Sequence, residues 1–274
     1  MRRILTGFLG LTLLVGLLWT TGLPRWGGPA QAQEQAQSEQ STSPFTPEQE
    51  ARIAELVEQT LLEKPEILVQ ASQLLRIRQQ LEEQRRLQQQ AMAQRSAIED
   101  DPMAPVAGNP DGEITVVEFY DYQCPFCRRA YDDVKQLLQR QTTVRYQFRQ
   151  FPVLDREGEP PVSRTAARYA LAADQQGKFL AYHDAVMTSG GRLTLDRLDE
   201  LALQAGLDLA QLKAYAADPA IERYLDETLD LAREVGIDGT PTFIINGRAL
   251  PGAQGLEAIE ATIAEAKADM QTGE

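Results

Sequence analysis

The chain contains few of the side chains that bind metals or nucleotides. Its 274 residues include only two cysteines and a single histidine, His183. A closed zinc site needs about four such ligands, so these residues cannot complete one. The sequence also has neither a Gly-x-Gly-x-x-Gly pattern nor a P-loop, and it therefore implies no nucleotide cofactor. A net charge of −13 argues against nucleic-acid binding. We expect no metal and no cofactor.

The two cysteines occur together in one short stretch, Cys124-Pro125-Phe126-Cys127. The residues before them, 114–120, are β-branched and aromatic and predict a buried strand, whereas residues 128–140 predict a helix with one apolar face. The pair therefore lies where a strand turns into a helix. A thiol at a helix N-terminus faces unpaired N–H groups and the positive end of the helix dipole, which favour the thiolate. Pro125 suits the first helical turn, where no backbone donor is needed.

This placement predicts redox chemistry for the cysteine pair. We expect Cys124 to be the attacking thiolate and Cys127 to resolve a mixed disulfide. The alternative is a structural disulfide, but a bridge across so short a loop removes little entropy from the unfolded chain.

Residues 1–32 have the features of a signal peptide. Arg2 and Arg3 precede an uncharged run over residues 4–23, and Ala30-Gln31-Ala32 matches a cleavage site. The alternative is an uncleaved membrane anchor, because the uncharged run is long enough to cross a hydrocarbon core of about 30 Å. Either way we expect an exported protein, periplasmic or otherwise extracytoplasmic, in a compartment where disulfides persist.

A linker and a helical arm follow the leader. Residues 33–44 are mostly Gln, Ser, Glu and Ala, which predicts a flexible linker. Residues 45–100 predict an arm of two helices. The first begins at the capping sequence Thr46-Pro47-Glu48-Gln49 and is broken at Lys64-Pro65, and the second covers residues 66–98.

The second helix carries apolar residues near heptad spacing, which suggests that the arm, Phe45 to Ile98, forms homo-oligomers. However, Gln84, Gln88 and Ala91 interrupt the apolar seam. The alternative is that the helix packs against its own catalytic domain.

Residues 101–272 predict an α/β catalytic domain. After a turn-rich start, the predicted order is strand, helix, a half-covered strand over residues 144–151, a helical insert over about residues 160–236, two strands joined at Asn246-Gly247, and a helix over residues 255–270. Within the insert the predicted helices cover residues 164–174, 179–188, 195–205, 209–216 and 221–235.

These motifs resemble the DsbA-like family of thiol–disulfide oxidoreductases. The likeness covers roughly residues 105–268 and rests on Cys-Pro-Phe-Cys after a Glu-Phe-Tyr strand, with Gly239-Thr240-Pro241 further along. It implies a thioredoxin fold with an inserted all-helical domain. The preceding arm is similar to that of exported relatives of the ScsC and Com1 kind, some of which oligomerise through their N-terminal segments.

The resemblance also implies roles for single residues. Cys124 would be the exposed nucleophile and Cys127 its buried partner, with Pro241 as a cis proline opposite them. Thr240 would present its main chain to substrate. Glu118 would be a buried acid that accepts or relays the Cys127 proton.

At the position of Phe126, strongly oxidising members of the family often have histidine. A phenylalanine supplies no charge or donor, so we expect a pair that is more oxidising than thioredoxin but milder than the strongest oxidants. We expect His183 to be structural, because Ala181, Ala185 and Val186 indicate a packed helix around it.

The implied function is the oxidation of reduced exported proteins, followed by reoxidation by a quinone-linked membrane partner. One alternative is an oligomeric isomerase or reductase acting on misbridged proteins. Another is a protein without catalytic activity, either a chaperone or a copper carrier that binds through its two thiolates.

Overall fold

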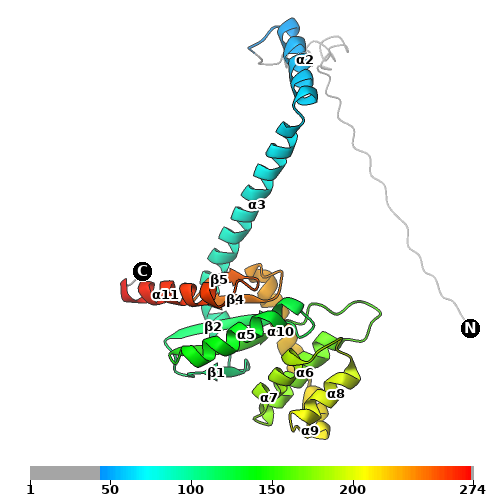
Figure 1. Cartoon of the computed structure of the whole chain (residues 1–274), viewed down its shortest axis with the longest axis vertical. Coiled ribbons are helices and arrows are strands. Elements are labelled where there is room, and N and C mark those ends of the chain that lie inside the picture. The colour runs from blue at the N-terminus through cyan, green and yellow to red at the C-terminus, as the bar shows by residue number, and fades with distance from the viewer. Residues whose placement is uncertain (1–43, 273–274) are drawn as a thin grey trace, which may run out of the picture. The chain divides into compact units, whose positions relative to one another are not determined.

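The structure, a computed structural model, describes residues 44–272 (Figure 1). The predicted signal peptide or anchor, and the linker up to residue 43, lie outside the described residues. Within residues 44–272, no helix combines the length and apolar character that crossing a membrane requires. The chain divides into two compact units, Met1–Val69 and Gln70–Glu274.

The described part of the first unit contains α2 (Pro47–Glu63) and the start of α3 (Glu66–Ala93). The predicted capping box is present: the Thr46 N–H donates to Gln49 Oε1 at 2.9 Å, and the Gln49 N–H donates to Thr46 Oγ1 at 3.3 Å. Helix α2 buries none of its residues. Its apolar side chains are therefore exposed, including Ile53, Leu56, Val57 and Leu62.

In the second unit, the C-terminal part of α3 packs onto the catalytic domain. Ala91 is fully buried in a cluster with Val117 and Ile244, against which Leu87 also packs. The predicted helix over residues 66–98 is in fact two, because α3 ends at Ala93 and a short α4 (Arg95–Glu99) follows. Ile98 is buried in the same cluster.

Gln88 explains why the apolar seam of this helix is interrupted. Its side chain donates to the Gly247 carbonyl at 3.1 Å and accepts from the Ala249 N–H at 3.0 Å. The Gln88 side chain thus pairs with backbone groups at the start of β5 (Arg248–Pro251). Because β5 is an edge strand, these groups could otherwise pair with a strand of another chain. Gln88 and Ala91 therefore face their own domain. Gln88 is polar because it pairs with backbone groups, and Ala91 is small because it packs in the buried cluster.

The sheet of the catalytic domain has the order β1-β3-β2-β4-β5. Strands β2 (Ile114–Tyr120) and β3 (Val144–Gln150) are parallel, while β4 (Thr242–Ile245) pairs antiparallel with both β2 and β5. The short β1 (Val106–Gly108), which the sequence did not predict, pairs antiparallel with β3. Asn246 and Gly247, with φ angles of 47° and 79°, form the predicted hairpin turn.

Strand β3 is more buried than predicted. Its alternation suggested a half-covered strand, but Gln147 and Arg149 are buried as well as Tyr146 and Phe148. The polar side chains are covered because the residues before β1 pack on them: Arg149 pairs with Asp101, and the Gln147 amide donates to the Asp101 carbonyl at 3.1 Å.

The insert consists of α6 (Val162–Gln175), α7 (Phe179–Thr188), α8 (Leu195–Gln204), α9 (Leu209–Ala216) and α10 (Pro219–Val235), each close to its predicted bounds. Helix α11 (Leu256–Thr272) is the last element of the described residues and packs beside α5 (Pro125–Arg140). Helix α5 begins at Pro125, which the sequence analysis placed in the first helical turn, so Cys127 belongs to that turn and Cys124 directly precedes it.

Candidate active site

Cys124 is the N-cap residue of α5, the position where helix N–H groups have no partner within the helix. The Cys127 N–H donates to the Cys124 sulfur at 3.5 Å. Cys124 is a free thiol and is only 4% exposed, less than the exposed nucleophile that the resemblance implied. The reason is the loop before β4: the Thr240 carbonyl oxygen lies 3.3 Å from the Cys124 sulfur and accepts a hydrogen bond from it when the thiol is protonated.

The surroundings of Cys124 favour its thiolate. A hydrogen bond from the Cys127 thiol is the largest cause, and the Thr240 side chain and the backbone N–H groups of Cys127 and Phe126 add to it. Together they outweigh burial and lower the pKa of Cys124 to about 5. At neutral pH this sulfur is therefore a thiolate.

Cys127 has the opposite character. It is completely buried, and burial raises the pKa of its thiol, as do its hydrogen bond to Cys124 and the charge of Glu118. The two sulfurs thus divide the roles of a dithiol, since one ionises readily and the other retains its proton.

Glu118 lies on β2 and is 1% exposed. Its neighbours Val117 and Phe119 face the opposite side of the sheet, so the alternation directs Glu118 toward the cysteines. The Tyr146 hydroxyl donates to Glu118 Oε2 at 2.6 Å, while Oε1 is buried with no hydrogen-bond partner among the described residues. Burial raises the pKa of Glu118 to about 7, so this carboxyl can exchange a proton near neutral pH.

The Thr240–Pro241 peptide bond is cis, as the resemblance implied. Beside it, Phe126, Arg129, Thr240 and Gly252 line a cavity of about 540 Å³. Phe126 is 52% exposed, and the Arg129 guanidinium lies 4.6 Å from the centre of its ring. The site therefore combines a thiolate, a buried thiol, a carboxyl with a raised pKa and an open apolar surface.

The sequence model of the family described as "DSBA-like thioredoxin domain" matches residues 115–264. The chain belongs to this family. The predicted thioredoxin fold with its helical insert is thereby confirmed.

Solved structures agree with the assignment. A thioredoxin-like oxidoreductase from Silicibacter pomeroyi is 37% identical with a TM-score of 0.60, and the match covers 63% of this chain and 97% of that one. A periplasmic thioredoxin-like protein from Salmonella enterica serovar Typhimurium is 30% identical with a TM-score of 0.56, covering 64% and 95%. A linker-deletion mutant of Proteus mirabilis ScsC is 25% identical with a TM-score of 0.60, covering 84% and 100%.

Curated relatives carry a different name. An Na(+)/H(+) antiporter NhaA 1 of Salinispora arenicola is 35% identical over 161 residues, which are 59% of this chain but 24% of the antiporter. This chain therefore spans about a quarter of the length of the curated relatives that it matches. The remaining three quarters of the antiporter lie outside the match.

The DSBA-like site includes a buried acid that the sequence analysis missed. Asp121 follows β2 and accepts hydrogen bonds from the Val153 N–H at 2.9 Å, the Leu154 N–H at 3.0 Å and the Ser163 hydroxyl at 2.7 Å. Burial raises the pKa of Asp121. The signal in the sequence was an acid placed between a buried strand and the cysteine motif.

Arg128, in the first turn of α5, was also missed, and no pattern in the sequence indicates its role. Its guanidinium donates to the Tyr122 carbonyl at 3.1 Å and to the Ser189 carbonyl at 2.8 Å. It therefore joins the loop before Cys124 to the loop that follows α7 of the insert.

His183 is fully buried where α7 of the insert packs against the sheet and α5, as expected for a structural residue. Its Nδ1 is 3.0 Å from the Tyr122 hydroxyl, and its ring stacks on Phe179. Burial lowers the pKa of His183 to about 3, so the ring is neutral. Within residues 44–272, no group of three or more His, Cys, Asp or Glu side chains could hold a metal ion.

Proposed function

We propose that this protein introduces disulfides into exported proteins by dithiol–disulfide exchange through Cys124 and Cys127. The observation that carries the proposal is the contrast within the pair, because the pKa of Cys124 is lowered to about 5 while that of its buried partner is raised. A stabilised thiolate favours the reduced form, which makes the disulfide form an oxidant.

The exchange begins with the pair oxidised. A client thiolate attacks the Cys124 sulfur, the Cys124–Cys127 bond breaks, and Cys127 leaves with the electron pair and takes up a proton. A second client thiolate attacks the client sulfur of the mixed disulfide and releases Cys124 as a thiolate. Two electrons pass from the client to the pair, and the client leaves with a new disulfide.

Glu118 is the group that we assign to the proton of Cys127. It is buried on the strand beneath α5, its charge acts on Cys127, and its pKa of about 7 allows both protonation states at neutral pH. Thr240 and Pro241 border the sulfur that the client attacks, and the apolar surface at Phe126 offers contact to a client segment.

The remaining parts of the cycle are proposed on the sequence. The leader over residues 1–32 supports export, and the periplasmic relative from Salmonella is consistent with it. A quinone-linked membrane oxidase is the class of acceptor that would take the two electrons and restore the disulfide.

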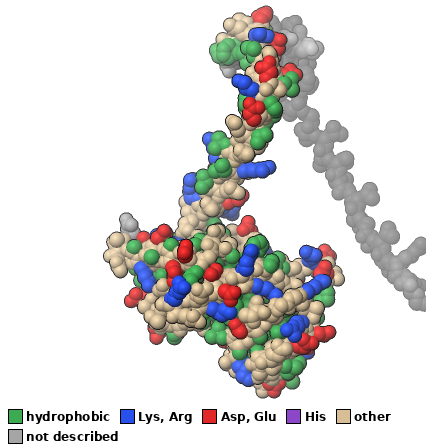
Figure 2. Space-filling model, in the orientation of Figure 1, with side chains coloured by type: hydrophobic (Ala, Val, Ile, Leu, Met, Phe, Trp, Pro, Cys, Tyr) green, Lys and Arg blue, Asp and Glu red, His purple; other side chains and the backbone are tan. Residues whose placement is uncertain are grey.

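Isomerisation is the second candidate, and the exposed arm favours it. Ile53, Leu56, Val57 and Leu62 are exposed in the first unit, and Figure 2 shows hydrophobic side chains on the surface of α2. An apolar surface of this kind suits association with a second copy. We place the oligomerising segment in residues 45–81, because Ala91 and Ile98 are buried against their own domain.

Refolding assays distinguish these functions. Faster recovery from a reduced client alone supports the oxidase, and recovery from a scrambled client supports the isomerase. Cys124→Ser serves as the control for both reactions. If this variant performs as well as the wild type in both assays, the protein acts only as a chaperone that holds unfolded chains. Deleting residues 45–81 and measuring the mass in solution tests association, which an unchanged monomer would exclude.

A further inference from the structure

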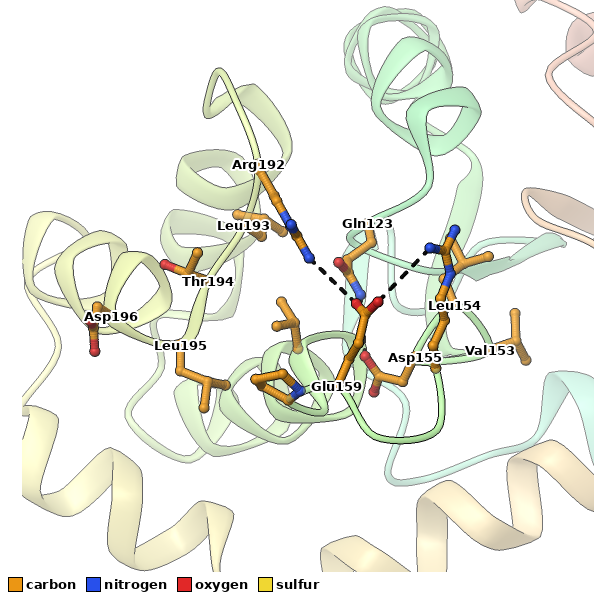
Figure 3. Close-up of a pocket in the computed structure, with 13 residues that line it drawn as sticks. Gln123, Val153, Leu154, Asp155, Glu159, Arg192, Leu193, Thr194, Leu195 and Asp196 are labelled. Atoms are coloured by element: carbon orange, nitrogen blue, oxygen red, sulfur yellow. Dashed lines mark hydrogen bonds and ion pairs between the residues drawn. The ribbon is translucent and has the colours of Figure 1, made fainter.

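A second cavity lies between the catalytic domain and the insert (Figure 3), and neither Cys124 nor Phe126 is among the residues that line it. Its volume is about 870 Å³, within the range of ligand-binding pockets. One wall is the loop over residues 153–160, and the other is the segment over residues 192–196. Gln123, which directly precedes Cys124, lines the cavity between these walls.

Hydrogen bonds hold the loop over residues 153–160 and the residues just before the wall over residues 192–196. Buried Asp121 accepts the N–H groups of Val153 and Leu154, and Asp155 accepts from the Ser163 N–H at 2.8 Å and from the Gln123 amide at 3.2 Å. On the insert side, the guanidinium of Arg128 donates to two carbonyl groups of the loop over residues 189–191. The cavity is thus built before any partner binds, which reduces the entropy lost on binding.

Apolar side chains border the cavity although they are open to solvent. Val153 and Leu154 are each 41% exposed, and Leu195, at the start of α8, is 39% exposed. Leu193 and Val162 add buried apolar surface to the lining. These side chains give the cavity, which Gln123 also lines, an apolar surface that an apolar segment would cover.

Two exposed ion pairs of Glu159 lie among the residues that line the cavity. Glu159 pairs with Arg192 at 3.4 Å, an ion pair that a dashed line marks in Figure 3, and with Arg156 at 4.0 Å. Both arginine side chains are 80% exposed, so each ion pair contributes at most about 1 kcal/mol. A bound chain can therefore displace them at small cost.

We propose that this cavity binds the client polypeptide on the second flank of its reacting cysteine. The inference rests on the proposed function, because a client joined to Cys124 must cross the sulfur with one flank on each side. One flank meets Thr240 and the Phe126 surface, and the other passes over Gln123 into the cavity. The occupant is an extended segment with apolar side chains, which unfolded clients expose and which contact Leu154 and Leu195.

The test uses oxidised wild-type protein and variants Leu154→Glu and Leu195→Glu, with Leu203→Glu as the matched control. Leu203 is an exposed leucine of α8, at 57%, and does not line the cavity. The substrates are reduced peptides with one cysteine and either leucine or serine on one flank. Reduced glutathione measures the reactivity of Cys124 without any flank.

We expect each cavity variant to lower the second-order rate constant for reduction of the Cys124–Cys127 disulfide by leucine-flanked peptides about tenfold, which corresponds to about half the burial of one leucine. The loss should occur for leucine on one flank only, while the serine peptides and glutathione react as with wild type. Equal rates for the variants and Leu203→Glu, or equal losses with leucine and serine peptides, would overturn the inference alone. An absence of reaction with glutathione in all proteins would overturn the proposed function and this inference with it.

Discussion

Replacing Phe126 with histidine should raise the reduction potential of the cysteine pair. Phe126 is the second residue of α5, and its side chain is half exposed beside the Cys124 thiolate. A histidine there adds a donor that the phenylalanine lacks. A hydrogen bond to a charged group contributes about 1.5–3 kcal/mol, and solvent at this exposed position reduces that to roughly one pKa unit. Because the thiolate belongs to the reduced form, stabilising it raises the potential by about 30 mV.

The structure also gives the value from which this change starts. Thioredoxin combines a cysteine pKa of about 7 with a potential of about −270 mV, and DsbA combines about 3.5 with about −120 mV. With a pKa of about 5, Cys124 lies between them. Two pKa units below thioredoxin correspond to about 60 mV, so we expect the wild-type pair at about −210 mV.

To measure the reduction potential, the protein is equilibrated in buffers with defined ratios of reduced to oxidised glutathione. The free thiols are then trapped by alkylation and counted by mass spectrometry. Phe126→Leu is the control, since it changes the shape of the side chain without adding a donor, and it should match the wild type. A wild-type potential at or below about −270 mV, or a histidine variant no more oxidising than the leucine variant, would refute the reasoning.

Three further predictions concern the free energy of unfolding of the reduced protein in urea. The raised pKa of Glu118 means that the native state holds its proton more tightly than the unfolded chain, so stability is lost as pH rises from about 4.5 through 7. Glu118→Gln should remove this loss of roughly 3 kcal/mol. If the free energy of unfolding of the variant depends on pH as that of the wild type does, the raised pKa of Glu118 is contradicted. The lowered pKa of His183 has the reverse effect, because stability is lost as pH falls from about 6.5 toward 3; His183→Phe should reduce that loss, and parallel profiles would contradict it. Gln88→Ala leaves the Ala249 N–H and the Gly247 carbonyl without their side-chain partner and should lower the free energy of unfolding by about 1–3 kcal/mol. A change below about 0.5 kcal/mol would show that these hydrogen bonds do not stabilise the edge strand β5.

Local patterns in the sequence predicted the elements that carry the site. The strand over residues 114–120 and the Asn246-Gly247 turn follow from β-branched composition and from residues that accept positive φ. The cysteines were placed correctly between strand and helix for the same reason. The cis bond at Pro241 could not come from such patterns, and only the family resemblance implied it.

The parts that the sequence did not predict depend on contacts between distant segments. Strand β1 has three residues and exists because it pairs with β3, and Gln88 looked like a defect in a coiled coil because its partner is a strand about 160 positions away. The same is true of Arg128 and Asp121, whose roles come from the loops that they hold. A single sequence does not show which backbone groups such side chains will meet.

The pH dependence of Cys124 alkylation is the most direct test of the account. With Cys127 replaced by serine to isolate one thiol, the rate should still show an inflection well below that of a free cysteine. In the reduced wild-type protein, mass analysis should show a single fast-reacting thiol, Cys124, with its inflection near pH 5. An inflection near pH 8.5 in the wild type, equal to that of a model cysteine, would contradict the claim that α5 and its neighbours stabilise this thiolate.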